Sequence, residues 1–219
     1  MKYDKYFYIY PPRPEKTTHF SELKGYDNNL FVAQPKYNGT CCIVFIPPKG
    51  GKAIVMNRHK LPIKNTFGIN FESLNTTEGW MVVVGELLNK SKRDENNEVF
   101  NGKYIMFDIL VLNSEYLIGS TIEQRLAKME VLFPSTRMSV SKKGVEGWEY
   151  LLTTRVENVY KAPSYLNGFL NLYEKLVVTD MYEGVVLKRR DAKLSLGLNE
   201  KNNADWQIKC RKPTKNYNF

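Results

Sequence analysis

The chain has 219 residues, of which 42% are hydrophobic and 13% aromatic, and its net charge is +9 at pH 7. This composition excludes a disordered tail, and the length is that of one large domain with ample material for a core. The excess of cations makes polyanions such as nucleic acids, nucleotides or an anionic surface candidate partners.

The first half of the chain predicts an extended N-terminal arm followed by strands. Residues 1–20 begin with aromatic side chains and continue into Pro11-Pro12-Arg13-Pro14, which favours an extended arm over a helix. A strand pattern begins at Leu30. The segments Thr40 to Ile46 and Ala53 to Met56 enclose Pro47 to Gly51, which predicts a hairpin. Further strands are expected over 81–88 and 104–112, joined by a charged surface loop over 89–102.

The second half predicts two helices and two late strands. Ser120-Thr121-Ile122-Glu123 fits a capping box and predicts an amphipathic helix as far as Phe133, ended by Pro134. A second helix is expected after Pro163. Its apolar face would hold Leu166, Phe169, Leu170, Tyr173 and Leu176. Strands are expected over 182–188 and 206–210. The sum is a single α+β domain over 1–219, with mainly antiparallel sheets and flanking helices.

Cysteine and histidine usage excludes several kinds of site. Cys41, Cys42 and Cys210 have no metal-ligand spacing and form no disulfide framework, and two histidines are too few for a zinc site or a catalytic triad. The N-terminus has no signal-peptide pattern, and the apolar stretches are too short for a membrane span. We therefore expect reduced, buried thiols in a monomeric protein of the cytoplasm, or of the host cytoplasm if the chain is viral.

Lys36 opens the string Lys36-Tyr37-Asn38-Gly39 directly after an apolar run. A lysine at a strand end, beside a glycine that lets the backbone approach a ligand, is suited to attack a phosphate. The amine must then lose its proton, which nearby cations and partial desolvation promote. This four-residue string alone is weak evidence for a nucleophile, because most lysines in such strings are solvated turn residues. The rest of the argument therefore depends on which groups follow in order.

Each further requirement of nucleotidyl transfer has a candidate at a strand end. Glu86 can accept a ribose hydroxyl, and Phe107 can stack on the base. Glu183 precedes an apolar run, where a carboxylate needs a metal or a cation as its partner. The candidates for charge neutralisation around the phosphates are Arg58, Lys188, and the pair Lys209 and Arg211 on one face of a strand. Each of these residues alone also fits an ordinary structural role.

The ordered set resembles the covalent nucleotidyltransferases, the family of ATP-dependent DNA ligases, RNA ligases and mRNA capping guanylyltransferases. Lys36 to Gly39 resembles the nucleophile motif, and Asn57-Arg58 the arginine motif. Val84 to Leu87 is similar to the ribose-binding motif, and Tyr104 to Ile109 to the base-stacking strand. Glu183 to Lys188 and Ile208 to Arg211 resemble the last two motifs, and the resemblance spans about 34–212.

The resemblance implies a lysyl-AMP intermediate on Lys36, transfer of AMP to a 5′-phosphate end, and attack by a 3′-hydroxyl. It implies ATP and Mg²⁺ (or Mn²⁺) as cofactors, and nucleic-acid ends as substrate, with a duplex nick favoured. By this resemblance the metal is held through Glu183. The nucleotide contacts Gln34, Lys36, Arg58, Glu86, Phe107, Lys188 and Lys209, and the catalytic set is Lys36, Glu183, Lys209 and Arg211.

Some positions depart from the family pattern. Asn38 replaces the usual aspartate, Cys41 stands where DNA ligases often carry arginine, and Arg211 replaces the second lysine of the last motif. Gly39-Thr40 is closer to the phage and editing-type RNA ligases. The sequence ends just past the last motif, so no C-terminal oligonucleotide-binding domain is expected within it.

We therefore expect an ATP-dependent polynucleotide ligase, with RNA-containing ends slightly favoured. A DNA ligase acting on nicked duplex DNA and, further off, a guanylyltransferase that carries GMP on Lys36 stay open as alternatives. A non-catalytic nucleic-acid-binding domain of the same shape is the alternative from another class. The basic stretch Lys209 to Lys215 and the arm at Arg13 and Lys16 are candidates for gripping the substrate.

Overall fold

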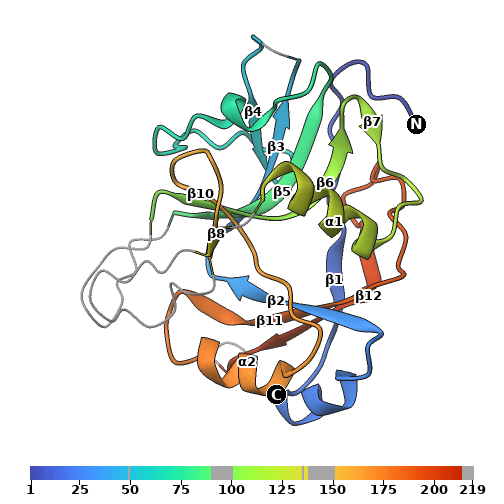
Figure 1. Ribbon diagram of the computed structural model, residues 1–219, viewed down its shortest axis with the longest axis vertical. Helices are drawn as coiled ribbons and strands as arrows, with labels where there is room; N and C mark the ends of the chain where they lie inside the picture. The colour runs from blue at the N-terminus through green and yellow to red at the C-terminus, as the bar shows by residue number, and fades with distance from the viewer. Residues whose placement is uncertain (49, 90–100, 135, 138–150, 214–219) are drawn as a thin grey trace.

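The computed structural model describes residues 1–48, 50–89, 101–134, 136–137 and 151–213 (Figure 1). Its strands are β1 (Arg13–Thr17), β2 (Phe31–Tyr37), β3 (Thr40–Ile46), β4 (Ile54–Asn57), β5 (Met81–Leu88), β6 (Lys103–Leu112), β7 (Glu115–Tyr116), β8 (Thr136–Arg137), β9 (Leu152–Thr153), β10 (Val159–Lys161), β11 (Tyr182–Arg189) and β12 (Asn203–Arg211). Its helices are α1 (Ile122–Leu132), α2 (Phe169–Leu176) and the short 3-10 turns η1 (Phe20–Tyr26) and η2 (Phe71–Leu74). The expected α+β class, with mainly antiparallel sheets and few helices, is confirmed.

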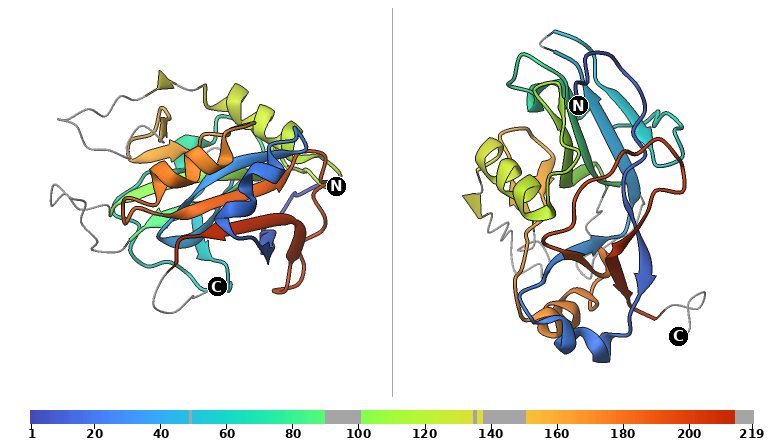
Figure 2. Two further views of the ribbon diagram at one scale, coloured as in Figure 1. Left: turned by 90° about the horizontal axis from the view of Figure 1, so that it is seen from below. Right: turned by 90° about the vertical axis from the view of Figure 1, so that its right-hand side faces the viewer.

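The strands form two sheets. The smaller has the order β1-β12-β11-β2, and the larger has the order β4-β3-β5-β6-β10-β9-β8, with β7 paired to β6. Among the described strands, the β1–β12 and β10–β6 pairs are parallel and the others antiparallel. Figures 1 and 2 show the sheets as separate layers, with α2 and η1 against the side of the smaller sheet that faces away from the larger one.

Alternation along the strands gives the smaller sheet two different faces. On β11 and β12, Val185, Leu187, Ile208 and Cys210 belong to the apolar cluster under α2. Their neighbours Val186, Lys188, Gln207 and Lys209 face the other way and line a cavity. The face that looks toward the larger sheet is therefore polar and the opposite face is core.

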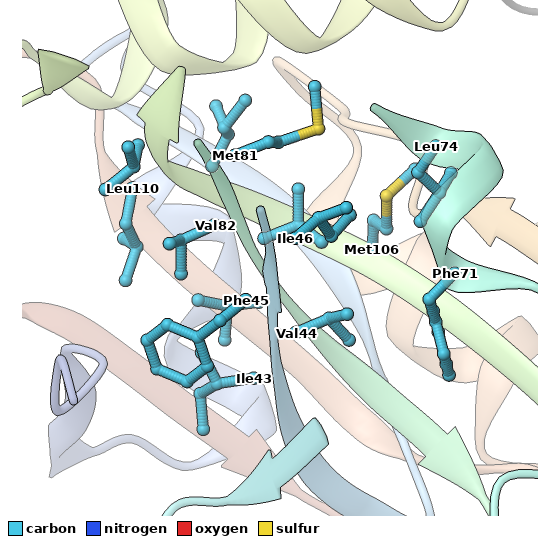
Figure 3. Close-up of a cluster of buried hydrophobic side chains, with 14 of the residues drawn as sticks. Ile43, Val44, Phe45, Ile46, Phe71, Leu74, Met81, Val82, Met106 and Leu110 are labelled. Atoms are coloured by element: carbon cyan, nitrogen blue, oxygen red, sulfur yellow. The ribbon is translucent and has the colours of Figure 1, made fainter. Parts of the chain in front are cut away.

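The larger sheet carries most of the core. Ile43, Val44 and Phe45 of β3 are fully buried, and so is Val82 of β5. Figure 3 shows these side chains packed with Met106, Leu110 and the η2 residues Phe71 and Leu74. The expected hairpin is confirmed, because β3 and β4 pair antiparallel, with Cys42 opposite Asn57.

Helix α1 packs on β6 and is capped one residue later than its sequence suggests. The N-cap is Thr121, whose hydroxyl accepts from the Gln124 backbone, while the Gln124 side chain accepts from the Thr121 backbone. The predicted box of Ser120 and Glu123 was therefore wrong by one position. The sequence contains two overlapping capping patterns. The backbone carbonyl oxygen of Ser120 instead accepts a hydrogen bond from Arg125.

Helix α2 is shorter than expected. It begins at Phe169 after Gly168, which has a left-handed backbone with φ of 72°. Leu166 lies outside the helix and is 50% exposed, so its assignment to the apolar face was wrong. Phe169, Tyr173 and Leu176 are buried as expected. The apolar spacing extends to the N-terminal side of the true helix start. Periodicity alone therefore does not show that the helix begins only after Gly168.

The first twenty residues are extended, as predicted, but they are part of the folded body. Tyr3 and Ile9 are completely buried, and β1 is paired to β12. Proline-rich sequence excludes a helix without indicating whether the chain packs.

Most of the expected charged loop over 89–102 and the end of the basic stretch at Lys215 lie outside the described residues. Among the described residues, no helix is long and apolar enough to cross a bilayer.

Candidate active site between the two sheets

A cavity of about 450 Å³ lies between the two sheets, which is the size of an ordinary small-molecule site. The smaller sheet contributes Gln34 and Lys36 from β2, Lys188 from β11, and Lys209 and Arg211 from β12. From the larger sheet and the turn after β4 come Cys41, Arg58, Glu86 and Phe107. These nine residues, all singled out from the sequence, share one cavity with Arg13 of the predicted arm. Glu183 is not in its lining and reaches it through Lys36.

Lys36 lies near the end of β2, an edge strand of the smaller sheet, where Pro35 is tolerated. Its Nζ is 2.5 Å from Glu183 Oε2. The same oxygen lies 3.4 Å from Arg211 Nε. The carboxylate therefore holds the lysine and the arginine on one side of the cavity.

A backbone irregularity places Glu183. The register between β11 and β2 shifts between Tyr182 and Gly184, and Gly184 has φ of 134°. A Cβ on Gly184 would lie 2.0 Å from the Cys210 carbonyl oxygen, so only glycine fits. Such bulges re-aim neighbouring side chains. Gly184 therefore sets the position of the Glu183 side chain.

Gly39 and Glu86 meet at the start of β3. The Gly39 amide donates to Glu86 Oε1 over 3.1 Å. A Cβ on Gly39 would lie 2.4 Å from the Leu87 carbonyl oxygen. Glycine is therefore required at position 39, because the turn passes directly over Glu86 and Leu87 of β5.

Phe107 and Lys188 form a cation–π pair across the two sheets. The Lys188 Nζ lies 4.9 Å from the Phe107 ring centroid and donates to the Phe107 carbonyl oxygen over 3.1 Å. Burial is the largest influence on Lys188 and lowers its pKa to about 8, with Asp108 opposing and Arg125 adding to the shift. The ring and the amine are therefore held in a fixed relation at the cavity.

Lys209 sits in the most cationic part of the cavity. Desolvation lowers the pKa of Lys209, and the neighbouring charges of Arg211, Lys36, Arg13 and Arg58 lower it further. This many cations in range of one another destabilise the empty site and favour an anion. The region is suited to neutralise phosphate charge.

Gln34 and Cys41 complete the inner wall. Gln34 is 1% exposed, and its Nε2 donates to Ser164 Oγ over 3.1 Å. Within the described part of the chain, its Oε1 has no hydrogen-bond partner. Burial is the main cause that raises the pKa of Cys41 to about 12, so this thiol is not a nucleophile. The expected placement of Cys41 and Cys42 on opposite faces is confirmed, because Cys42 is in the core.

A divalent cation fits this site only with help from a substrate. Among the described residues no three His, Cys, Asp or Glu side chains gather as a metal cage. Glu183, with 27% of its side chain exposed beside the cavity, is a single carboxylate of the kind that holds Mg²⁺ together with waters and phosphate oxygens. An all-protein metal centre is not supported in the described residues.

Sequence reasoning missed one whole side of the cavity. Residues 11–15, His59, Glu200 and Asn203 also line it. These residues belong to none of the motifs. The only sequence feature that pointed toward them was the cationic arm around Arg13.

This arrangement, an antiparallel two-sheet domain with a lysine-rich cavity between the sheets, has the fold of the ligase domain of ATP-dependent DNA ligases. No protein-family model and no curated protein matches the sequence. The chain is similar to the ligase domain of LigD from M. tuberculosis, with a TM-score of 0.59 and 15% identity over 94% of this chain and 61% of that one.

Two further solved structures show the same likeness. A mycobacterial DNA ligase D complexed with ATP and MES gives a TM-score of 0.58 and 16% identity, covering 94% of this chain and 62% of that one. A structure from a study of Lig E DNA ligases as a minimal DNA-binding scaffold gives 0.52 and 15%, covering 93% and 70%. The chain thus spans less than two thirds of the two ligase D structures.

Asn38 gives a first testable prediction, because it stands where the family pattern has aspartate. Its Nδ2 donates to the Asp180 carbonyl oxygen over 3.0 Å, and its backbone amide donates to the Met181 carbonyl oxygen over 2.9 Å. A carboxylate cannot donate. We expect Asn38→Asp, which restores the common motif, to lower the free energy of unfolding by about 1 kcal/mol in urea titrations.

The matched control for that prediction is Asn171→Asp. Asn171 is an exposed residue of α2 whose side chain makes no hydrogen bond within the described structure. The control should unfold like the wild type. An Asn38→Asp protein as stable as this control would show that the contact with Asp180 contributes nothing.

Proposed function

We propose that the chain is an ATP-dependent polynucleotide ligase that works through a lysyl-AMP intermediate. The observation that carries the proposal is the convergence of Lys36, Glu86, Phe107, Lys188, Lys209 and Arg211 on one cavity of nucleotide size. The shared fold with ATP-dependent DNA ligase domains supports the same reading.

In the first step the unprotonated Lys36 Nζ attacks the α-phosphorus of ATP. A P–N bond forms, the bond from that phosphorus to the bridging oxygen breaks, and pyrophosphate leaves with the electron pair. The amine proton is lost to solvent. Lys209 and Arg211 neutralise the charge that builds on the α-phosphate. Mg²⁺ held by Glu183 would supply further neutralisation.

In the later steps AMP moves to the end to be sealed. An oxygen of a 5′-phosphate attacks the adenylyl phosphorus, the P–N bond breaks, and Lys36 leaves as an amine that takes a proton from solvent. A 3′-hydroxyl oxygen then attacks the activated 5′-phosphorus, and AMP leaves. The chain's residues hold the nucleotide during these steps, with Phe107 under the base and Glu86 at the ribose.

ATP is proposed over GTP because one of the similar solved structures, a mycobacterial DNA ligase D, is complexed with ATP.

The substrate has two candidates. Gly39-Thr40 and the Ile208-Lys209-Cys210-Arg211 string favour RNA-containing ends. The similar structures carry titles that name DNA ligases, which favours nicked duplex DNA. We place RNA-containing nicks first, because those residues belong to this chain.

The deciding experiment presents labelled 5′-phosphorylated nicks in RNA, DNA and hybrid duplexes to the protein with ATP and magnesium chloride. Sealed product on RNA-containing nicks is the expected result, and sealing of DNA alone would select the second candidate. Covalent labelling by GTP in place of ATP would instead identify a guanylyltransferase. A protein that labels with neither nucleotide, yet binds the duplexes in a salt-sensitive way, would be a non-catalytic binding domain.

A further inference from the structure

The outer part of the cavity is built by segments that carry no nucleotidyltransferase motif. One is the N-terminal stretch 11–15, which includes the start of β1. The other is 200–203, which leads into β12. The two are tied together, because the Arg13 amide donates to the Asn202 carbonyl oxygen over 3.1 Å and Asn202 Nδ2 donates to the Tyr10 carbonyl oxygen over 2.7 Å. This wall is therefore a fixed part of the fold.

Two arginines of this region are each anchored through Nε. Arg13 Nε donates to Asn203 Oδ1 over 2.6 Å. Arg58 Nε donates to His59 Nε2 over 3.1 Å, and His59 Nδ1 lies 2.7 Å from Glu200 Oε1. Because Nε2 accepts, the proton of a neutral His59 is on Nδ1 and points to Glu200. Segment 200–203 thus anchors both guanidinium groups, one directly and one through His59.

The hydrogen bond at Nε fixes each guanidinium group and so sets the orientation of its two terminal nitrogens. In the described part of the chain, the two terminal nitrogens of Arg13 and of Arg58 make no hydrogen bond to protein. Both side chains line the cavity and lie within electrostatic range of Lys209. The carboxylates that also line this region are Glu15, which is exposed, and Glu200, which His59 engages. Planar arginine forks with their ends unengaged are matched to phosphate oxygens.

We propose that Arg13 and Arg58 form a subsite for the β- and γ-phosphates of ATP, and so for the pyrophosphate that leaves when Lys36 is adenylated. This inference rests on the proposed function, and it adds Arg13 as a binding residue with Asn203, His59 and Glu200 as positioning residues. The subsite lets this domain hold the leaving group with its own side chains. AMP, which lacks both phosphates, does not engage it.

The test compares two nucleotides that differ only at this subsite. The α,β-methylene analogue of ATP carries all three phosphates but cannot be cleaved by Lys36, whereas AMP carries one. We expect Arg13→Gln to weaken binding of the analogue by about ten- to a hundredfold in calorimetry with magnesium chloride, and to leave AMP binding unchanged. Lys24→Gln removes the same charge at an exposed residue of η1 outside the cavity, and should change neither.

AMP binding also reports folding, so each outcome is decisive. An Arg13→Gln protein that keeps the wild-type ratio of analogue to AMP affinity overturns the inference. If that variant loses AMP binding as well, Arg58→Gln is judged by the same ratio. Incubation of the wild type with ATP separates the two proposals, because a mass increase of one AMP supports the proposed function whatever the ratio shows. No mass increase and no analogue binding would sink both.

Discussion

Lys36→Ala is expected to abolish covalent labelling by ATP completely, while the wild type gains the mass of one AMP. The reason is chemical, because the phosphoramidate requires an amine within the cavity that loses its proton and forms the P–N bond. Lys36 lines this cavity, and its Nζ is 2.5 Å from Glu183 Oε2. Intact-protein mass spectrometry after incubation with ATP and magnesium chloride gives the answer directly.

Lys36→Arg is the sharper companion to this variant. Arginine keeps the ion pair with Glu183, so the fold and the local charge are preserved, but it cannot act as a nucleophile at neutral pH. We expect it to bind AMP and to form no adduct. An adduct on either variant, mapped by peptide digestion to another residue, would show that Lys36 is not the nucleophile.

Arg125→Met is expected to cost about 3–5 kcal/mol of unfolding free energy, the largest loss of stability that we predict. Arg125 is completely buried in α1, and it binds both oxygens of Asp108 of β6, over 2.8 and 3.0 Å. A third donor, Nη1, satisfies the Ser120 carbonyl oxygen over 2.7 Å. Removing the arginine leaves a buried carboxylate without its cation.

The matched control is Arg190→Met, since Arg190 makes an ion pair with Glu123 at the surface. Such a pair contributes about 0–1 kcal/mol, so its loss should be small. Urea titrations of both variants give the comparison. If Arg125→Met unfolds at the same urea concentration as Arg190→Met, the buried pair does not stabilise the fold.

The dependence on pH follows from the same pair. Burial is the largest single influence and alone would raise the pKa of Asp108, but the charge and hydrogen bonds of Arg125, with Lys188 and the Ile109 amide, together outweigh it and lower the pKa. The contribution of Asp108 to stability is therefore complete above its unfolded pKa of about 3.9 and is lost as the pH falls through its lower folded pKa. In Arg125→Met the buried carboxylate gains from protonation. The deficit of the variant should consequently narrow as the pH falls.

Local patterns in the sequence predicted most strands and all the motif residues now found around the cavity. Strand periodicity depends on residues that are neighbours in the sequence. The hairpin of β3 and β4 and the late strands β11 and β12 could therefore be predicted from the sequence. The roles assigned to the site residues stay predictions until they are measured. What the sequence favoured, and the structure agrees with, is that Lys36, Glu86, Phe107 and Lys209 share one cavity.

The parts that were missed depend on contacts between distant segments. Nothing near Arg13 in the sequence indicates that Asn203 holds its guanidinium, and nothing near His59 indicates Glu200. Asp108 and Arg125 likewise come from different elements. The predicted starts of the two helices were wrong for a different reason. The apolar spacing of α2 extends to the N-terminal side of Gly168, and two capping patterns overlap before α1.

The smaller sheet has a consequence for synthesis on the ribosome. Its strands β1 and β2 are made first, and their partners β12 and β11 are made last. The larger sheet pairs strands that are mostly near in sequence, whereas β2 must wait for 182–189 to emerge, and long-range pairing of this kind is slow. A nascent or truncated chain therefore carries Lys36 on a strand that is not yet paired, without Lys188, Lys209 and Arg211 beside it. The surroundings that Lys36 has in the folded structure are therefore complete only after β11 and β12 have been made.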